Sequence, residues 1–462
     1  MQPALSVNRP LLSEIDCCVK VHFLCHELVR AGHASSGEWP NRYAVLVDGH
    51  SAVENIAAAV SGDVVCLCEF KGGWVALDGL ILKNLLNQPM AVPEQCSRVS
   101  RWAETDGKTS GQSYRSKLFA LNKIDRKRYG MAMMRAAVVS EPGGLENIKI
   151  EDLDIPQPGP GQILIQVHYC GCNWADTQMR EGIYPHPTNY PVTLGLEIAG
   201  EVVDVGTHVS HLEPGQQVST LVESGGYANF CVADAGLATV VPAGLSLASA
   251  AAYPVQGLTA YHMLYTVGRI SAGDWVLVHA SGGGVGLFVT QLAVRAGANV
   301  IGTVGTPGKE KNPLAYGATS VINLNDGDFV EQVLDLTQGQ GVDLAIDSLG
   351  ATTLDKTFSA VRMLGHIINI GEAEGNPIEN IRQRCLVRSQ TFTRLHLGHV
   401  IDFPELWQEG NQFILDALQA GWLDPTIVET FDLENAREMH AAIENRTNSG
   451  KLLLRTSPDS GS

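Results

Sequence analysis

An apolar strand that runs directly into a cluster of glycines constrains this chain more than any other feature. Residues 274–280 form the apolar segment, and the glycine-rich residues 281–286 follow at once. The pattern predicts a strand, a tight turn and an amphipathic helix that continues to Ala296. Glycines let a backbone approach a phosphate, and a helix N-terminus offers free N–H groups and a positive dipole end. We therefore expect a nucleotide pyrophosphate to contact Ser281, Gly282, Gly283, Gly284 and Val285.

The next predicted strand, residues 299–304, indicates which dinucleotide binds. In NAD-binding folds an acidic residue at the end of this strand usually accepts a hydrogen bond from the ribose 2′-hydroxyl. Here Thr303, Gly305, Thr306 and Lys309 occupy the strand end and the loop, and no acid is present. Hydroxyl groups and an ammonium suit a 2′-phosphate, so we expect NADPH rather than NADH. The alternative is that Lys309 is an ordinary solvated lysine.

Length, charge and cysteine usage narrow the class of protein. A chain of 462 residues suggests two or three domains. The net charge of −17 argues against nucleic acid or an anionic membrane as the main partner. The sequence contains no apolar stretch long enough to span a bilayer and no recognisable secretory signal. The ten cysteines form no C-x-x-C pair, which predicts a reduced, cytoplasmic protein.

Residues 1–130 differ in pattern from the rest of the chain. Residues 43–48 and 63–68 read as short strands, and residues 80–86 read as part of a buried helix. We find no functional motif in this extension. Met131, Met133 and Met134 precede the first clear strand at 135–140. Three interpretations stay open, namely translation that starts at one of these methionines, a poorly ordered extension, or a genuine interaction module.

From Met134 onward the pattern changes twice. Residues 162–168 and 199–206 alternate apolar and polar side chains, as half-buried strands do, and Pro and Gly turns separate such segments. After residue 256 helices alternate with strands, including 342–347 and 367–371. This alternation predicts an α/β fold with a parallel sheet and right-handed crossovers. A final strand is expected at 451–454.

Several of these motifs together resemble one known family. The segments are Asn173–Thr177 with Arg180, Gly182 and Tyr184, then 195–200, 256–260, 279–286, 302–309 and 347–350. From Met134 to Arg455 the chain resembles the quinone oxidoreductase (zeta-crystallin-like) branch of the zinc-free medium-chain dehydrogenase/reductase superfamily. The resemblance implies a GroES-like β-rich catalytic domain that holds the substrate, at 134–257 and 396–456. It also implies a Rossmann domain, a doubly wound parallel sheet that binds NADPH, at 258–395.

The resemblance also implies an activity and residue roles. The family looks like NADPH-dependent reductases of quinones and related activated carbonyls. We expect catalytic roles for Asn173, Asp176 and Tyr184, although Asp176 is equally well explained as a helix or turn cap. Tyr184 is interpreted either as a hydroxyl donor or as a wall residue that stacks on a flat acceptor. The remaining expected cofactor contacts are Gln256, Thr259, Gly371 and Lys451.

The motifs predict that no metal is bound. Relative to zinc alcohol dehydrogenases, Asn173 stands where a ligand thiol would fall and Leu196 where a ligand histidine would fall. Only Cys231 lies between Asn173 and Cys385, so the four ligands of a structural zinc lobe are missing. Without a Lewis acid the oxidation of an alcohol is difficult. Hydride transfer to an electron-poor acceptor is easier, and the protein then mainly positions two reactants.

Three functions remain in competition. The leading prediction is an NADPH-dependent quinone reductase. A 2-alkenal or enoyl reductase that acts on α,β-unsaturated carbonyls would use the same hydride chemistry. A non-catalytic, crystallin-like NADPH-binding protein belongs to a different class. The expected partners are a small quinone or enone, with no nucleic acid and no membrane, and a second copy in a homodimer through edge strands of the Rossmann sheets.

Overall fold

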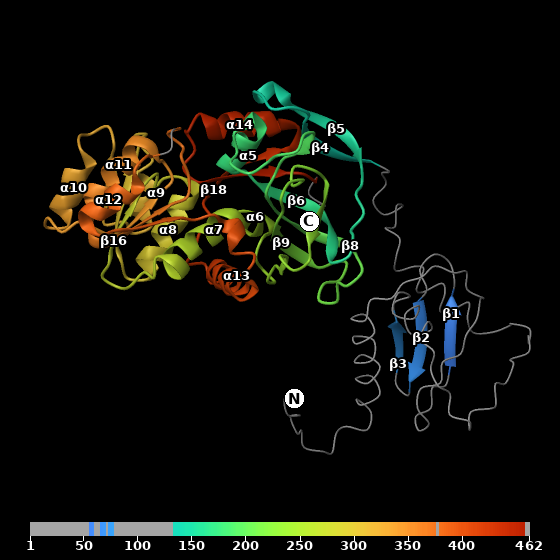
Figure 1. Ribbon diagram of the computed structural model, residues 1–462. Helices are drawn as coiled ribbons and strands as arrows, with labels where there is room; N and C mark the ends of the chain where they lie inside the picture. The colour runs from blue at the N-terminus through green and yellow to red at the C-terminus, as the bar shows by residue number, and fades with distance from the viewer. Residues whose placement is uncertain (1–54, 60–64, 71–72, 78–132, 376–377, 458–462) are drawn as a thin grey trace, which may run out of the picture. The chain divides into compact units, whose positions relative to one another are not determined.

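The computed structural model describes residues 55–59, 65–70, 73–77, 133–375 and 378–457 (Figure 1). The chain divides into two compact units, Met1–Lys108 and Thr109–Ser462. In the first unit, β1 (Asn55–Ala59), β2 (Val65–Phe70) and β3 (Gly73–Leu77) form an antiparallel sheet. The strand predicted at 63–68 overlaps β2. The strand predicted at 43–48, the helix predicted at 80–86 and Met131 lie outside the described residues.

A six-stranded parallel sheet forms one half of the second unit (Figure 1). Its strand order is β14-β13-β12-β15-β16-β17, so the chain runs outward from β12, returns to its other side and runs outward again. This is the doubly wound order of a dinucleotide-binding sheet, and it confirms the predicted Rossmann fold. The strands are β12 (Trp275–Val278), β13 (Asn299–Val304), β14 (Ser320–Asn323), β15 (Val342–Asp347), β16 (Val361–Asn369) and β17 (Thr391–Arg394).

Both faces of this sheet are buried, because the side chains of each strand alternate between two cores. Val276 and Val278 pack with Phe288 of α8 in one core, while Leu277 between them packs in the other with Phe329 and Leu354. Strands covered on both faces read as continuous apolar runs, which explains the sequence of β12. The helices around the sheet are α7 (Pro254–Tyr261), α8 (Gly284–Arg295), α9 (Lys311–Ala315), α10 (Phe329–Leu336), α11 (Ala351–Ala360), α12 (Ile381–Arg388) and α13 (Pro404–Gln419).

The other half of the second unit is rich in antiparallel strands. A sheet of order β11-β9-β8-β6-β19-β18, with β10 also paired to β6, adjoins the three-stranded sheet β5-β4-β7. The last strand, β19, pairs with β6 in the register Leu453↔Gly171, so the end of the chain returns to this half, as the resemblance implied. The strands are β4 (Met133–Val139), β5 (Ile148–Asp154), β6 (Gln162–Gly171), β7 (Val192–Thr193), β8 (Glu197–Val205), β9 (Gln217–Leu221), β10 (Phe230–Asp234), β11 (Thr239–Val240), β18 (Ile427–Asp432) and β19 (Lys451–Arg455).

Three helices complete this GroES-like half, and short helical turns join the elements. The helices are α5 (Trp174–Glu181), α6 (Leu247–Ala251) and α14 (Ala436–Glu444), and a π-helical turn, η2 (His262–Val267), extends α7. The 3₁₀ turns are η1 (Leu145–Asn147), η3 (Leu397–His399) and η4 (Leu433–Asn435). Among the described residues, no helix is both long enough and apolar enough to cross a membrane.

The predicted elements agree closely with the structure except at their ends. The strand predicted at 367–371 belongs to β16, which begins earlier, at Val361. Its first half was missed because Met363 and Leu364 are exposed and Leu364 has a φ of 61°, which breaks the alternation expected of a buried strand. The helix after the glycine cluster ends at Arg295, one residue before the predicted end.

Close packing of β6 on β8 depends on Gly200, and this contact can be tested. A Cβ at Gly200 would overlap the backbone carbonyl oxygen of Gln166, so an added methyl group must push the two strands apart. We expect Gly200→Ala to lower the midpoint of thermal unfolding, Tm, by about 5 °C or more. Gly305→Ala is the matched control for stability, because nothing lies within 4 Å of that position. Equal Tm values for the two variants would contradict this account.

Candidate active site

The glycine cluster forms a tight turn between β12 and α8. The Ser281 N–H donates to the Thr303 carbonyl oxygen at 2.9 Å, which ties the turn to the neighbouring strand β13. A Cβ at Gly286 would lie 2.5 Å from the carbonyl oxygen of Ala280, so glycine is required where helix and turn meet. The α8 N-cap is Gly283, and no side chain caps it. The first-turn N–H groups of α8 are therefore available to an anion.

A polar side chain covers this turn and carries an unsatisfied atom. The carboxamide of Gln256, from α7, lies so close to Gly284 that a Cβ there would overlap it. Its Nε2 donates to the Asn173 Oδ1 at 3.1 Å. Its Oε1 is buried and has no hydrogen-bond partner. Because a buried carbonyl oxygen without a donor is costly, the turn fits a ligand that supplies one. The residues at the turn therefore suit a dinucleotide.

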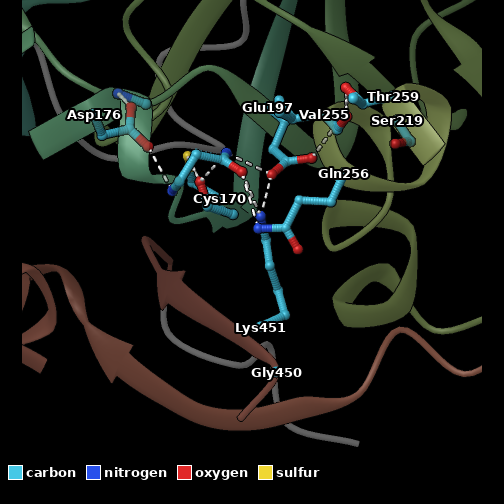
Figure 2. A network of polar contacts seen from close by, with 12 residues as sticks. Cys170, Asp176, Glu197, Ser219, Val255, Gln256, Thr259, Gly450 and Lys451 are labelled. Carbon is cyan, nitrogen blue, oxygen red and sulfur yellow. Dashed lines mark hydrogen bonds and ion pairs between the residues drawn. The ribbon is translucent and has the colours of Figure 1, made fainter. Parts of the chain in front are cut away.

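Gln256 belongs to a buried network that joins four separate elements (Figure 2). The Lys451 Nζ, at the start of β19, donates to the Asn173 Oδ1 at 2.9 Å and is ion-paired with the Glu197 Oε1. The Asn173 Nδ2 donates to the same Glu197 oxygen at 2.7 Å. The Glu197 Oε2 accepts the Val255 N–H at 2.7 Å. Figure 2 shows Glu197, Lys451 and Gln256 pointing toward one another.

Glu197 is the centre of this network, and the sequence did not reveal it. Both Glu197 and Lys451 have fully buried side chains, with 0% exposure each. Gly171 makes room for them, because a Cβ there would overlap the Glu197 carboxylate and lie 2.7 Å from the Lys451 Cε. A single acidic residue after Gly195-Leu196 is a weak signal. Its partners are 24 and 254 residues away in the chain, so only the fold brings them together.

Asp176 is fully buried in the first turn of α5, close to this network. Its Oδ2 accepts the Asn173 N–H at 2.8 Å, and its Oδ1 accepts the Gly195 N–H at 3.2 Å. Asn173 is the N-cap of α5, and each of Asn173 and Asp176 accepts the backbone N–H of the other with its side chain, which forms a capping box. Burial raises the pKa of Asp176 to about 7, although the hydrogen bonds from the Asn173 and Gly195 N–H groups act to lower it. Its contacts are those of a cap, and its catalytic role stays a prediction.

Tyr184 follows α5 and is half-buried against the core of the GroES-like half. Burial, with a further contribution from the charge of Asp176, raises the pKa of its hydroxyl. No polar contact joins Tyr184 to Asn173 or Gln256. The structure therefore joins Asn173, Gln256 and Lys451 in one hydrogen-bonded network, of which Tyr184 is not a part.

The loop after β13 presents the residues predicted to select NADPH. Gly305 and Thr306 are exposed, and Lys309 is half-buried. Burial, and after it the charge of Arg446, lowers the pKa of Lys309. Arg446 was missed by sequence reasoning, since it lies 137 residues further along the chain. It donates to the Ala373 carbonyl oxygen at 2.9 Å, and its guanidinium lies 5.2 Å from the Trp174 ring centroid.

Thr259 and Gly371 are the remaining residues predicted to contact the cofactor, and they lie in α7 and after β16. The Thr259 Oγ1 donates to the Val255 carbonyl oxygen at 2.6 Å within its own helix. Gly371 follows β16, and its carbonyl oxygen accepts the Asn369 Nδ2 at 2.8 Å. The Ser449 Oγ donates to the Gly282 carbonyl oxygen at 3.0 Å. The segment before β19 thus contacts the glycine turn directly.

The described residues contain no group of three or more His, Cys, Asp or Glu side chains that could hold a metal ion. Cys170 and Cys172 are buried in the core of the GroES-like half. Burial raises the pKa of Cys170, and it raises that of Cys172 to about 12. Both thiols are therefore protonated at neutral pH, as packing residues are. Metal-free function stays a prediction.

Comparison with known proteins identifies the family. The family model of the alcohol dehydrogenase GroES-like domain matches residues 159–263, and that of the zinc-binding dehydrogenase matches residues 284–412. A 2-haloacrylate reductase of a Burkholderia species is 34% identical over 330 residues, which is 70% of this chain and 99% of that protein. Human quinone oxidoreductase is 32% identical over 335 residues, which is 70% of this chain and 98% of that protein.

A solved structure agrees with these relatives. The crystal structure of Escherichia coli quinone oxidoreductase complexed with NADPH superposes with a TM-score of 0.67 at 30% identity, covering 70% of this chain and 99% of that chain. The chain belongs to the quinone oxidoreductase branch of the medium-chain dehydrogenase/reductase superfamily. It is an oxidoreductase.

The buried ion pair between Glu197 and Lys451 leads to a prediction about the stability of the chain. Lys451→Met leaves the Glu197 carboxylate buried without its cation, so we expect a loss of about 3–5 kcal/mol in the free energy of unfolding. The double variant Glu197→Gln/Lys451→Met is expected to recover much of that loss, because no charge remains buried. Chemical denaturation of the four chains of this cycle measures the coupling.

Lys356→Met is the matched control for this cycle. Lys356 pairs with Asp328 at 3.6 Å, and both side chains are more than 40% exposed. We expect a loss of at most about 1 kcal/mol for that variant. A loss in Lys451→Met as small as in Lys356→Met would contradict the role given to the buried pair.

Asp176 predicts a specific pH dependence of stability. An unfolded aspartate titrates near pH 4, and in the folded chain the pKa of Asp176 is about 7. Between these values the folded state keeps a proton that the unfolded state releases, so the stability contributed by this carboxyl falls as pH rises. Asp176→Asn removes the titration. We expect the Tm of this variant, minus that of the original chain, to rise from pH 4 to pH 7 and then level off. Asp335→Asn changes an exposed carboxyl and is the control, for which this difference should not change with pH.

Proposed function

We propose that this oxidoreductase transfers reducing equivalents from NADPH to a quinone. The observation that carries the proposal is the unsatisfied Oε1 of Gln256, buried beside the glycine turn at the end of a polar network. The relatives supply the chemistry, since proteins called quinone oxidoreductase match nearly their full length, and one of them was solved with NADPH. Bound NADPH supplies a hydride from its nicotinamide ring.

The residues of the network hold and orient the cofactor. The Gln256 Oε1 can accept a hydrogen bond from a ribose hydroxyl or an amide. Asn173 fixes the Gln256 carboxamide through the bond to its Nε2. Lys451 donates to the same Asn173 oxygen, and the Asn173 Nδ2 donates to Glu197, so the Asn173 side chain is held at both of its polar atoms. The chain thereby restricts the orientation of the cofactor before the acceptor arrives, which is the main contribution a protein makes to hydride transfer.

The preference for NADPH rests on charge at the end of β13. Lys309 and Arg446 lie close enough for the charge of one to lower the pKa of the other. No carboxylate is ion-paired with Lys309 among the described residues, so an anion there would relieve the repulsion. A 2′-phosphate carries the charge and the acceptor oxygens that such a pair binds.

Tyr184 is proposed to face the acceptor. Its ring lies in the loop after α5, partly buried against the core, and burial raises the pKa of its hydroxyl, which is therefore protonated at neutral pH. A protonated phenol can donate to the acceptor oxygen, and its ring can stack on a flat acceptor. Asp176 contributes to this region by capping α5, which carries the loop.

Reduction of an α,β-unsaturated carbonyl is the second candidate. The 2-haloacrylate reductase is among the similar relatives, at 34% identity. The same hydride donor serves both reactions, so the acceptor pocket decides between them. A non-catalytic NADPH-binding role is the third outcome that the experiment below distinguishes.

A homodimer and a cytoplasmic location are part of the proposal. β17 forms an edge of the described parallel sheet. Beside it, β16 and α12 expose Met363, Leu364, Leu386 and Val387, each at least 67% accessible. An open strand edge next to apolar side chains favours pairing with a second copy.

The central test measures NADPH oxidation by the purified chain with 1,4-benzoquinone or 9,10-phenanthrenequinone. NADH and an aliphatic enone are assayed in parallel. We expect rapid turnover of the quinone with NADPH, unchanged by a zinc chelator. Faster turnover of the enone supports the second candidate, and tight NADPH binding without any turnover supports the non-catalytic role and overturns the reductase proposal.

Cofactor preference is tested at Lys309. Removal of its charge weakens only the contact with a 2′-phosphate. We therefore expect Lys309→Ala to raise the KM for NADPH by about tenfold or more, which corresponds to about 1.4 kcal/mol. The KM for NADH should stay within about twofold. Exposed Lys311→Ala is the control, and an equal effect of both variants on NADPH would contradict the assignment.

A further inference from the structure

A row of aromatic rings, three of them imidazoles, lies outside the network described above. The Tyr184 ring is followed by His186 at a centroid distance of 5.5 Å. His186 lies 4.1 Å from His396, with the two rings tilted by 37°. His396 lies 5.2 Å from His399 in an edge-on arrangement. We call His186, His396 and His399 the histidine row.

The histidine row connects the two halves of the second unit. His186 lies in the loop between α5 and β7, beside Tyr184, the residue proposed to face the electron acceptor. His396 comes two residues after β17, and the preceding Leu395 N–H still donates to the Asn369 carbonyl oxygen. His396 therefore stands just beyond the carboxyl edge of the parallel sheet. Ligands of doubly wound sheets bind beyond this edge.

The charges around the row are basic. Arg394, at the end of β17, contributes to the charge that acts on His396. Among the described residues, no carboxylate is ion-paired with any of the three imidazoles; Glu372 lies 3.5 Å from Arg394, and the charge of Asp176 acts on Tyr184. The His396 Nδ1 is buried and has no hydrogen-bond partner. Burial, and then the charges of His186, His399 and Arg394, lowers the pKa of His396.

We propose that the histidine row and Arg394 bind an anionic group carried by the electron acceptor. This inference rests on the reductase activity proposed above and names the class of acceptor. Next to Tyr184, the row can hold the charged substituent while the reducible part of the acceptor lies toward the cofactor. Rings that lack acidic partners accept a proton when an anion arrives, and the anion then offsets the repulsion between them.

The histidine row therefore predicts how the affinity for an anionic acceptor depends on pH. The groups that face His396 are His186, His399 and Arg394, with Tyr184 next to His186 and Glu372 paired with Arg394. Protonated imidazoles attract the anion and neutral ones do not. The KM for an anionic acceptor should rise as pH increases from 6 to 8, while the KM for a neutral acceptor of the same shape should not follow it.

The experiment compares 1,4-naphthoquinone with 1,4-naphthoquinone-2-sulfonate in NADPH oxidation by the full chain. The principal variant is His186→Phe/His396→Phe, which keeps two aromatic rings and removes two titratable groups. His399→Phe changes an exposed ring and serves as a second, milder variant. His208→Gln is the matched control, because His208 is exposed and lies beyond the far end of β8 from Glu197.

At pH 6 we expect the double variant to lose about tenfold or more in kcat/KM for the sulfonate. Its kcat/KM for the neutral quinone should stay within about twofold, and its KM for the sulfonate should no longer depend on pH. His399→Phe should show a smaller loss in the same direction. An unchanged ratio between the two quinones in both variants would rule out a small anionic acceptor at the histidine row, even if both quinones are reduced.

Binding without turnover separates this inference from the proposed function. Calorimetric titration with redox-inert 2-naphthalenesulfonate, in buffers of different ionisation enthalpy, reports protons taken up on binding. We expect proton uptake by the original chain and none by the double variant. Proton uptake without any quinone reduction would support the anion site and reject the reductase. Absence of sulfonate binding together with rapid quinone reduction would support the reductase and reject the anion site.

An anionic group can come from a small acceptor or from the phosphates of a coenzyme A thioester. The crotonyl thioesters of coenzyme A and of N-acetylcysteamine therefore form a second pair of acceptors. If the double variant changes the ratio of kcat/KM values only within the naphthoquinone pair, the row binds a small anion. If it changes the ratio only within the thioester pair, the row binds the phosphates of coenzyme A. A variant that changes neither ratio overturns the inference.

Discussion

The buried ion pair between Glu197 and Lys451 is the interaction on which the rest of the site depends. Two fully buried opposite charges are tolerated only when hydrogen bonds satisfy their remaining atoms. Asn173 and the Val255 N–H provide those bonds. The requirement fixes four elements at one point, namely the N-cap of α5, the start of β8, the first turn of α7 and the start of β19.

This arrangement links the chain's last strand to the cofactor turn. Lys451 enters the network from β19, and Ser449 just before it contacts the Gly282 carbonyl oxygen. Gln256 then extends the network to Gly284, where its Oε1 is buried without a hydrogen-bond partner. The halves of the second unit are therefore joined by polar contacts at the same place where the proposed chemistry occurs. The residues expected to stabilise the fold are thus the same ones proposed to hold the cofactor.

The sequence predicted the fold well and the site only in part. Strands such as β13 and β15 were found with their observed bounds, because apolar runs and glycine turns are local signals. Gln256, Asn173 and Lys451 were found through motifs, and the structure brings them together. Glu197 and Arg446 were missed because their importance arises from partners far away in the chain. His186 and His396 carried no motif, and only the packing of the two halves places their rings side by side.

The amino-acid sequence by itself determined the family, the doubly wound sheet and the glycine turn, because backbone geometry and apolar periodicity are encoded within a few neighbouring residues. The tertiary structure alone decided which polar side chains share a buried space. Electrostatic and hydrogen-bond energies depend on distance and burial, and neither quantity is defined until strands such as β6 and β19 have paired. The histidine row, the Glu197 network and the Lys309–Arg446 pair each bring together residues from distant parts of the chain, so they exist only in the folded structure.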